Sequence, residues 1–248
     1  MAILSNLKER IFHRNVTEDS DSVQNIINPD TPFRVIEAYK TARTNLMFTL
    51  AGESGCKRII VTSPISREGK STTAINLAIT FAQTGARVIV IDADLRRPRL
   101  HIYLEQKNDV GMAQYLGGFK SDYHEVVRHI PHYNLDCITG GPVPPNPSEL
   151  LISSAMGKLL DGLSEEYDYI IVDSPPVNLV TDSVSIAEHM SGALLVVRQN
   201  YTTSESLNQA ISALEFGKIK ILGYVLNASE NLRRGTYKKS YYKSGYYK

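Results

Sequence analysis

The sequence predicts a doubly wound α/β fold, in which helices cover both faces of a mainly parallel sheet. From Arg58 onward, short runs of β-branched and apolar residues alternate with segments of helical periodicity. The runs are continuously apolar, as in strands buried on both faces, whereas strands with one face in water alternate. We expect strands at residues 59–61, 88–91, 135–138, 169–172, 193–197 and 219–226.

The chain divides into three expected parts. Residues 1–30 are polar and acidic and predict a flexible N-terminal arm, residues 31–230 form the folded domain, and residues 231–248 form a flexible tail. The domain is expected to open with a helix, because Thr31 suits an N-cap, Pro32 suits the first turn, and apolar residues recur at helical spacing as far as Leu50.

Two more helix boundaries have clear signals. A helix over residues 70–84 has an apolar side and stops before Gly85, which suits a C′ residue. A proline-rich loop then leads to Asn146, where Pro147 and Glu149 predict a helix start with a capping box.

The composition limits the compartment and the class of protein. With 42% hydrophobic and 21% charged residues, the chain is neither collagen, coiled coil nor wholly disordered. Cys56 and Cys137 are expected to be free thiols, and the first ten residues do not resemble a leader, so we expect a reducing, cytoplasmic location. No apolar run reaches the roughly 18–20 residues that cross a bilayer.

A Gly-Lys-Ser triplet stands where a phosphate-binding loop would place it, between an expected strand and the helix that starts at Lys70. Backbone N–H groups at such a helix start bind anions, the lysine reaches the outer phosphates, and the serine hydroxyl binds Mg²⁺. The strict motif has a glycine six residues before the lysine, where this chain has Pro64. The candidate nucleotide-binding residues are Ser66, Arg67, Glu68, Gly69, Lys70, Ser71 and Thr72.

Two other expected strands end in carboxylates. Asp92 and Asp94 follow the strand at 88–91 at alternate positions, and Asp173 follows the strand at 169–172. For each acid taken alone, a helix cap or a residue of a surface turn is an equally simple interpretation. Because carboxylates this close need a compensating cation, the three acids and the lysine loop together predict a site for Mg²⁺.

Charge and tyrosine are concentrated at the end of the chain. Residues 231–248 hold six cations and no acid, so that the other residues sum to −5 in a chain whose net charge is +1. Five of the fourteen tyrosines lie in the last twelve residues: Tyr237, Tyr241, Tyr242, Tyr246 and Tyr247. Such a tail is expected to be flexible, so that its tyrosines can reach an active site and accept phosphate. The alternative is a nucleic-acid tail, because tyrosines stack on bases and cations neutralise phosphates.

These motifs resemble those of the bacterial tyrosine kinases of capsule and exopolysaccharide systems. The resemblance rests on the loop without its first glycine, on Asp-x-Asp-x-Arg at 92–96, on Ile-Ile-Val-Asp-Ser-Pro-Pro at 170–176, and on the tyrosine-rich tail. It extends from about Pro32 to Lys248. Glu37, Lys40 and Arg43 are similar to the family's Glu-x-x-Arg-x-x-Arg helix at subunit contacts, although lysine at position 40 lacks the planar fork of arginine.

The resemblance implies a P-loop fold related to that of ParA and MinD, which transfers the γ-phosphoryl group of ATP to tyrosine. It implies that Lys70 stabilises the β/γ-phosphates, that Ser71, Asp94 and Asp173 hold Mg²⁺, and that Asp92 orients or deprotonates the acceptor tyrosine. Phosphoryl transfer needs mainly positioning and charge neutralisation, which agrees with this division. Asn227, at the end of the last expected strand, is a candidate contact for adenine, or else an ordinary turn residue.

The family also implies partners. We expect tails phosphorylated in trans within a ring-shaped homo-oligomer, a separate membrane adaptor that recruits the kinase to the inner face of the cell membrane, protein substrates in polysaccharide production, and a cognate tyrosine phosphatase. No nucleic-acid partner is expected.

Two other functions fit parts of the sequence. A ParA/MinD-like positioning ATPase shares the fold, but those proteins carry a signature lysine five residues before the loop lysine, where this chain has Ile65. A nucleotide-sensing scaffold would bind ATP without turnover. The paired aspartates and the tail favour the kinase.

Overall fold

The fold is built on one seven-stranded sheet. The computed structural model describes residues 25–180, 186 and 189–228. Strand order is β3-β4-β2-β5-β1-β6-β7, every neighbouring pair is parallel except β3 and β4, and this confirms the doubly wound, mainly parallel prediction. The strands are β1 (Lys57–Thr62), β2 (Val88–Asp92), β3 (Val127–Ile130), β4 (Leu135–Ile138), β5 (Tyr169–Asp173), β6 (Gly192–Arg198) and β7 (Ile221–Asn227).

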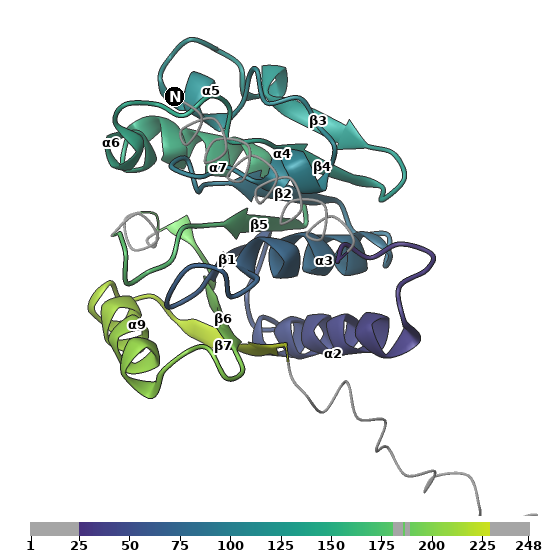
Figure 1. The fold of residues 1–248 in the computed structure, drawn as a ribbon. Helices are drawn as coiled ribbons and strands as arrows, with labels where there is room; N and C mark the ends of the chain where they lie inside the picture. The colour runs from purple at the N-terminus through teal and green to yellow at the C-terminus, as the bar shows by residue number, and fades with distance from the viewer. Residues whose placement is uncertain (1–24, 181–185, 187–188, 229–248) are drawn as a thin grey trace, which may run out of the picture.

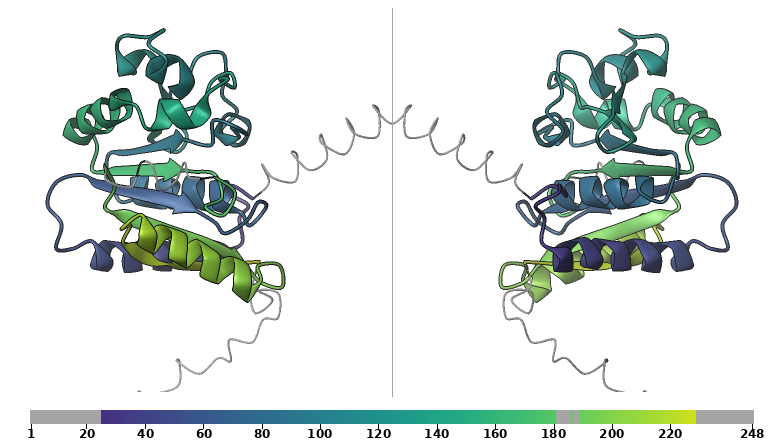
Figure 2. Two further views of the ribbon diagram at one scale, coloured as in Figure 1. Left: turned by 90° about the vertical axis from the view of Figure 1, so that its left-hand side faces the viewer. Right: turned by 90° about the vertical axis from the view of Figure 1, so that its right-hand side faces the viewer.

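Helices cover both faces of this sheet (Figures 1 and 2). One core lies between the sheet and α2 (Phe33–Thr49) with α3 (Lys70–Ala82). The other lies on the opposite face, beneath α5 (Met112–Leu116), α7 (Ser154–Glu166) and α9 (Ser204–Phe216). Short helical turns complete the connections: α4 (Leu100–Tyr103), α6 (Pro147–Leu151) and the 3₁₀ turn η1 (Tyr123–Glu125).

The structure contains all six expected strands, and every strand end lies within two residues of the predicted one. Strand β3 was not predicted. It is an antiparallel edge strand in which Arg128 and His129 stand between Val127 and Ile130, and only Ile130 is buried. Such a short, half-exposed strand lacks the apolar run that identified the others.

Several helix boundaries differ from the predictions. Helix α2 begins at Phe33 with Pro32 at the N-cap position, one residue later than expected, and the Thr31 hydroxyl accepts a hydrogen bond from Asn28 N instead (2.9 Å). Helix α3 ends at Ala82 with its C-cap at Gln83, so Gly85 lies two residues beyond the cap, although its φ of +87° is left-handed.

Asn146 is the N-cap position of α6, as predicted, but the capping box is wrong. The side-chain amide of Asn146 donates to the Glu149 carboxylate (2.7 Å), and no side chain caps a backbone N–H group. Helix α6 accordingly has only five residues before its C-cap at Ile152.

The expected N-terminal arm of residues 1–30 is too long. Ile26 and Ile27 are 2% and 4% exposed and pack in the core beneath α2 and α3. The fully buried Asn76 of α3 accepts from Ile27 N (2.8 Å) and donates to Asn25 O (3.0 Å), so one side chain binds this segment to the domain. Residues 1–24 and the tail lie outside the described residues.

No helix in the described part of the chain is long and apolar enough to cross a membrane.

We predict that Asn76→Ala lowers the free energy of unfolding by about 2 kcal/mol, because Ile27 N–H would stay buried without its acceptor. Urea denaturation measures the change, and limited proteolysis should cut earlier near residues 25–31. The matched control is Thr44→Ala on the exposed side of α2, which should change stability by less than about 0.5 kcal/mol. Equal stability of both variants would contradict the assigned role of Asn76.

Candidate active site

The candidate site lies where the carboxyl ends of three neighbouring strands meet at the centre of the sheet. Register pairs Asp173 of β5 with Asp92 of β2 on one side and with Val61 of β1 on the other. The chain from β1 then turns through residues 63–69 into α3. Parallel strands present their carboxyl ends at one edge, so this topology alone brings the predicted loop and acids together.

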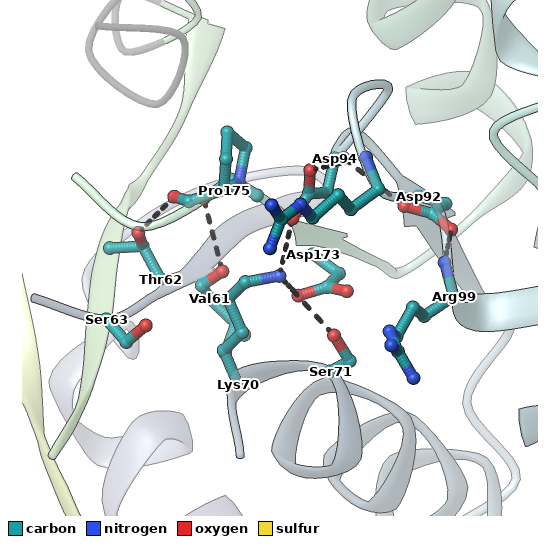
Figure 3. Close-up of polar contacts among 12 residues, drawn as sticks. Val61, Thr62, Ser63, Lys70, Ser71, Asp92, Asp94, Arg99, Asp173 and Pro175 are labelled. Atoms are coloured by element: carbon teal, nitrogen blue, oxygen red, sulfur yellow. Dashed lines mark hydrogen bonds and ion pairs between the residues drawn. The ribbon is translucent and has the colours of Figure 1, made fainter. Parts of the chain in front are cut away.

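The ammonium group of Lys70 is at the centre of this cluster (Figure 3). Its Nζ lies 3.0 Å from Asp94 Oδ2, 3.4 Å from Asp173 Oδ1 and 3.4 Å from Ser71 Oγ. The side chains of Lys70 and Asp94 are 12% and 9% exposed, and that of Asp173 is 1% exposed. Burial opposes the charge of the ammonium, but the carboxylates of Asp173 and Asp94 outweigh it and raise the pKa of Lys70.

Asp92 is held differently from the other two acids. It is fully buried, its Oδ2 accepts from the backbone N–H groups of Arg99 (2.8 Å) and Leu100 (3.0 Å), and its Oδ1 accepts from Asp94 N (3.2 Å). Burial, reinforced by the neighbouring charge of Asp173, raises the pKa of Asp92 well above the usual range for aspartate. In this structure Asp92 therefore fixes the turn that carries Asp94.

The cluster fits a divalent cation. Two carboxylates, of Asp94 and Asp173, contact one ammonium group, and the buried Asp173 Oδ2 has no hydrogen-bond partner. Burial also raises the pKa of Asp173. Within the described residues no group of three His, Cys, Asp or Glu forms a complete metal cage. In nucleotide-binding proteins, Mg²⁺ is usually held by one or two carboxylates together with phosphate oxygens and water.

The phosphate loop has an unusual backbone. Gly69, its last residue, has φ +91°, and a Cβ atom there would lie 2.1 Å from Asn227 Nδ2. That amide donates to Glu68 O (2.8 Å). The structure thus places the predicted Asn227 beside the loop, where it supports the loop backbone. Its contact with adenine stays a prediction.

The structure brings the other predicted loop residues to the same place. Ser66, Arg67 and Glu68 form the turn before Gly69, and Ser71 and Thr72 lie in the first turn of α3. The first N–H groups of an α-helix have no intrahelical acceptor, which gives this turn its capacity for anions. The Glu68 side chain is an exception among the candidates, because its carboxylate is fully buried and hydrogen-bonded inside the protein.

Sequence reasoning missed the residues that support the loop from outside. Thr62 Oγ1 donates to Pro175 O (2.8 Å) and joins the end of β1 to the segment after Asp173. Arg198, at the end of β6, donates to the backbone oxygen of Arg67, and Thr202, in the turn that follows, donates to the Glu68 carboxylate. These residues carry no motif, since their role depends on contacts across the fold.

The expected subunit-contact residues lie along α2. Glu37 and Lys40 pair with each other (2.9 Å) and have 44% and 41% exposed side chains. Arg43 instead donates to Thr80 O of α3 (2.7 Å) and so packs its own domain together. The five predicted acceptor tyrosines, Tyr237, Tyr241, Tyr242, Tyr246 and Tyr247, lie outside the described residues.

Comparison with known proteins agrees with this fold. Residues 59–244 match the family model of the CobQ/CobB/MinD/ParA nucleotide binding domain. Tyrosine-protein kinase YwqD of Bacillus subtilis (strain 168) is 38% identical over 201 residues, which cover 81% of this chain and 84% of YwqD.

Solved kinase structures are also similar. The kinase domain of Escherichia coli tyrosine kinase ETK superposes with a TM-score of 0.74 at 32% identity, covering 85% of this chain and 80% of that one. The chimerical protein CapA2B2 also gives a TM-score of 0.74, at 34% identity, covering 80% of this chain and 86% of that one. Shared fold and shared sequence place this chain in the CobQ/CobB/MinD/ParA nucleotide-binding family, as a bacterial tyrosine kinase of the capsule and exopolysaccharide type.

Proposed function

We propose that this tyrosine kinase uses Mg-ATP to phosphorylate the tyrosines of its own tail, in trans, within a ring-shaped homo-oligomer. The observation that carries the proposal is the position of Lys70, whose ammonium group lies between Asp94 and Asp173 and beside Ser71. An amine, two carboxylates and a hydroxyl at the start of a helix form the set that binds a metal-bound triphosphate.

Each residue has a separate part in this reaction. Lys70 exchanges its carboxylate partners for phosphate oxygens and neutralises charge on the transferred group. Ser71, Asp94 and Asp173 hold Mg²⁺, which supplies charge stabilisation when bound, and the free Asp173 Oδ2 is available for it. The backbone of residues 66–72 binds the phosphates, and Asn227 contributes a contact to adenine.

Asp92 is proposed to act on the acceptor tyrosine, by orienting or deprotonating its hydroxyl. Its carboxylate accepts from three backbone N–H groups in this structure, two at Oδ2 and one at Oδ1, so we propose that the phenol approaches Oδ1, which has fewer backbone donors. Burial favours the neutral form of Asp92, and once ionised its carboxylate is a stronger base than that of an ordinary aspartate because its pKa is raised.

Charge supports the tail as acceptor. The tail carries +6 and the remaining chain −5, so that a tail is attracted to a neighbouring body. Each phosphotyrosine adds about −1.5 to −2, and five of them reverse the sign of the tail. We infer that this reversal loosens the ring.

The remaining partners follow from the family. We propose that Glu37, Lys40 and Arg43 contribute to the ring contact, that an adaptor recruits the kinase to the inner face of the membrane, and that a tyrosine phosphatase reverses the modification. The substrates are proposed to be proteins of polysaccharide production. The similar structure CapA2B2 is a chimera, as expected if such a kinase works joined to a second protein.

Replacing the five tail tyrosines by phenylalanine should abolish at least about nine-tenths of the phosphotyrosine formed after incubation with Mg-ATP, because the acceptors are removed. Mass spectrometry locates the phosphates. The matched controls, Tyr201→Phe and Tyr224→Phe, change partly exposed tyrosines of the folded domain and should leave phosphorylation unchanged. Phosphate found only outside residues 237–247 would contradict the tail as acceptor.

Asp92→Asn should lower kcat for tyrosine phosphorylation by about 10²–10⁴-fold while nucleotide affinity changes little, because the general base is lost. Stopped-flow transfer to a tyrosine peptide and calorimetric ADP titration separate the two effects. Lys70→Met, in comparison, should lose nucleotide binding as well. If Asp92→Asn kept its kcat and lost only thermal stability, Asp92 would act as a structural residue alone.

Glu37→Ala should reduce the oligomer to smaller species with little effect on folding, because an exposed helix ion pair contributes only about 0.5 kcal/mol. Light scattering gives the mass, and mixing with a Lys70→Met chain shows whether transfer between chains falls with it. Thr41→Ala, an exposed residue of the same helix, is the control. A wild-type chain that is monomeric at all concentrations would refute the ring.

A further inference from the structure

We propose that Glu68 is a positioning residue for ATP binding, whose carboxylate fastens the phosphate loop to the turn at residues 198–202. We call this contact the loop latch and define it by Glu68, Thr202 and Arg198. The inference deepens the proposed function, on which it rests, because it concerns how the same nucleotide site is held ready.

Glu68 is placed unusually for a loop carboxylate. It is fully buried, and its Oε2 accepts from the backbone N–H of Ile65 (2.9 Å), three residues earlier in the same loop. Its Oε1 accepts from the hydroxyl of Thr202, which is 134 residues further along the chain. A buried carboxylate is costly unless it is hydrogen-bonded, so these contacts fix the side chain at the back of the loop.

Thr202 has a defined orientation in the latch. Its Oγ1 accepts from the backbone N–H of Arg198 (2.8 Å), and its single hydroxyl proton is donated to Glu68. The Arg198 guanidinium group in turn donates to Arg67 O (3.1 Å). The turn after β6 therefore holds two consecutive residues of the phosphate loop, one by its side chain and one by its backbone.

The loop needs such external support. Arg67 has φ +66° and Gly69 has φ +91°, so two of three consecutive residues adopt left-handed backbone. That conformation is uncommon for a residue with a side chain and persists where surrounding contacts determine it. The latch supplies those contacts before nucleotide arrives. Binding of phosphate then does not have to order the loop, and a preorganised site binds more tightly.

This role differs from that of Asn227. Asn227, at the end of β7, donates a hydrogen bond from its amide to the backbone carbonyl of Glu68. In the latch, Thr202 from the turn after β6 donates to the side-chain carboxylate of Glu68. Removing the Thr202 hydroxyl thus tests the latch without changing Asn227, Lys70 or any of the three acids.

The test compares Thr202→Val, which keeps the shape of the side chain but has no hydroxyl, with Thr202→Ser, which keeps the hydroxyl. Because the lost bond is to a charged group, Thr202→Val should raise the KM for ATP and the Kd for ADP about tenfold or more. Its kcat at saturating ATP should stay within about twofold, because bound phosphate restores the loop. Thr202→Ser should behave as wild type.

Thr203→Ala is the structural control, since Thr203 caps α9 by accepting from Ser206 N (3.1 Å) and makes no contact with Glu68. It should lower the melting temperature without changing the KM for ATP. A KM for Thr202→Val equal to that of wild type would overturn the latch, as would a fall in melting temperature alone. A wild-type protein that binds no adenine nucleotide would instead refute the proposed function.

Discussion

The pairing of the Lys70 ammonium with carboxylates at the ends of β2 and β5 is the constraint on which the site depends. One ammonium group cannot balance Asp92, Asp94 and Asp173 together, so the buried cluster favours a further cation. Burial raises the pKa of Asp92 and Asp173. The raised pKa favours their neutral forms and so reduces the cost of burying uncompensated negative charge. The carboxylates still outnumber the ammonium group, and this surplus of negative charge in a buried site favours binding of magnesium.

The order of strands explains why these groups meet. Strand β5 lies between β1 and β2, so Asp173 stands in register with Asp92 on one side and next to the start of the phosphate loop on the other. Crossover connections carry α3 and α7 over opposite faces, and those helices bury the strands so completely that β2 has no exposed residue. A rigid centre of this kind holds the carboxylates in place, whereas the loops that are proposed to bind phosphate and acceptor lie at the carboxyl edge of the sheet.

The sequence predicts local features well and long-range ones poorly. Continuous apolar runs predicted six strands, and short motifs predicted that Lys70, Asp94 and Asp173 lie at or near strand or helix ends, because each of these signals is contained within a few consecutive residues. Packing of Ile26 was not predicted, since two apolar residues in a polar segment carry no periodicity and their partner Asn76 lies 49 residues beyond Ile27. The role of Glu68 was missed for the same reason, because its partner Thr202 is remote and its own position inside a phosphate loop favoured a direct role at the nucleotide.

Nucleotide and metal are coupled by the same charges. In the free protein Lys70 forms ion pairs with Asp94 and Asp173, so the amine can turn to a phosphate only if those buried carboxylates gain another positive partner. Conversely, a cation placed among the carboxylates without phosphate would face the ammonium group of Lys70 at short range and be repelled. Movement of Lys70 to a phosphate and entry of a metal ion among the carboxylates are therefore each unfavourable alone. Together they are favourable, because the metal ion replaces the ammonium group and the phosphate attracts that group away. On the proposed function, the geometry of Lys70 therefore favours a metal-bound triphosphate over either component.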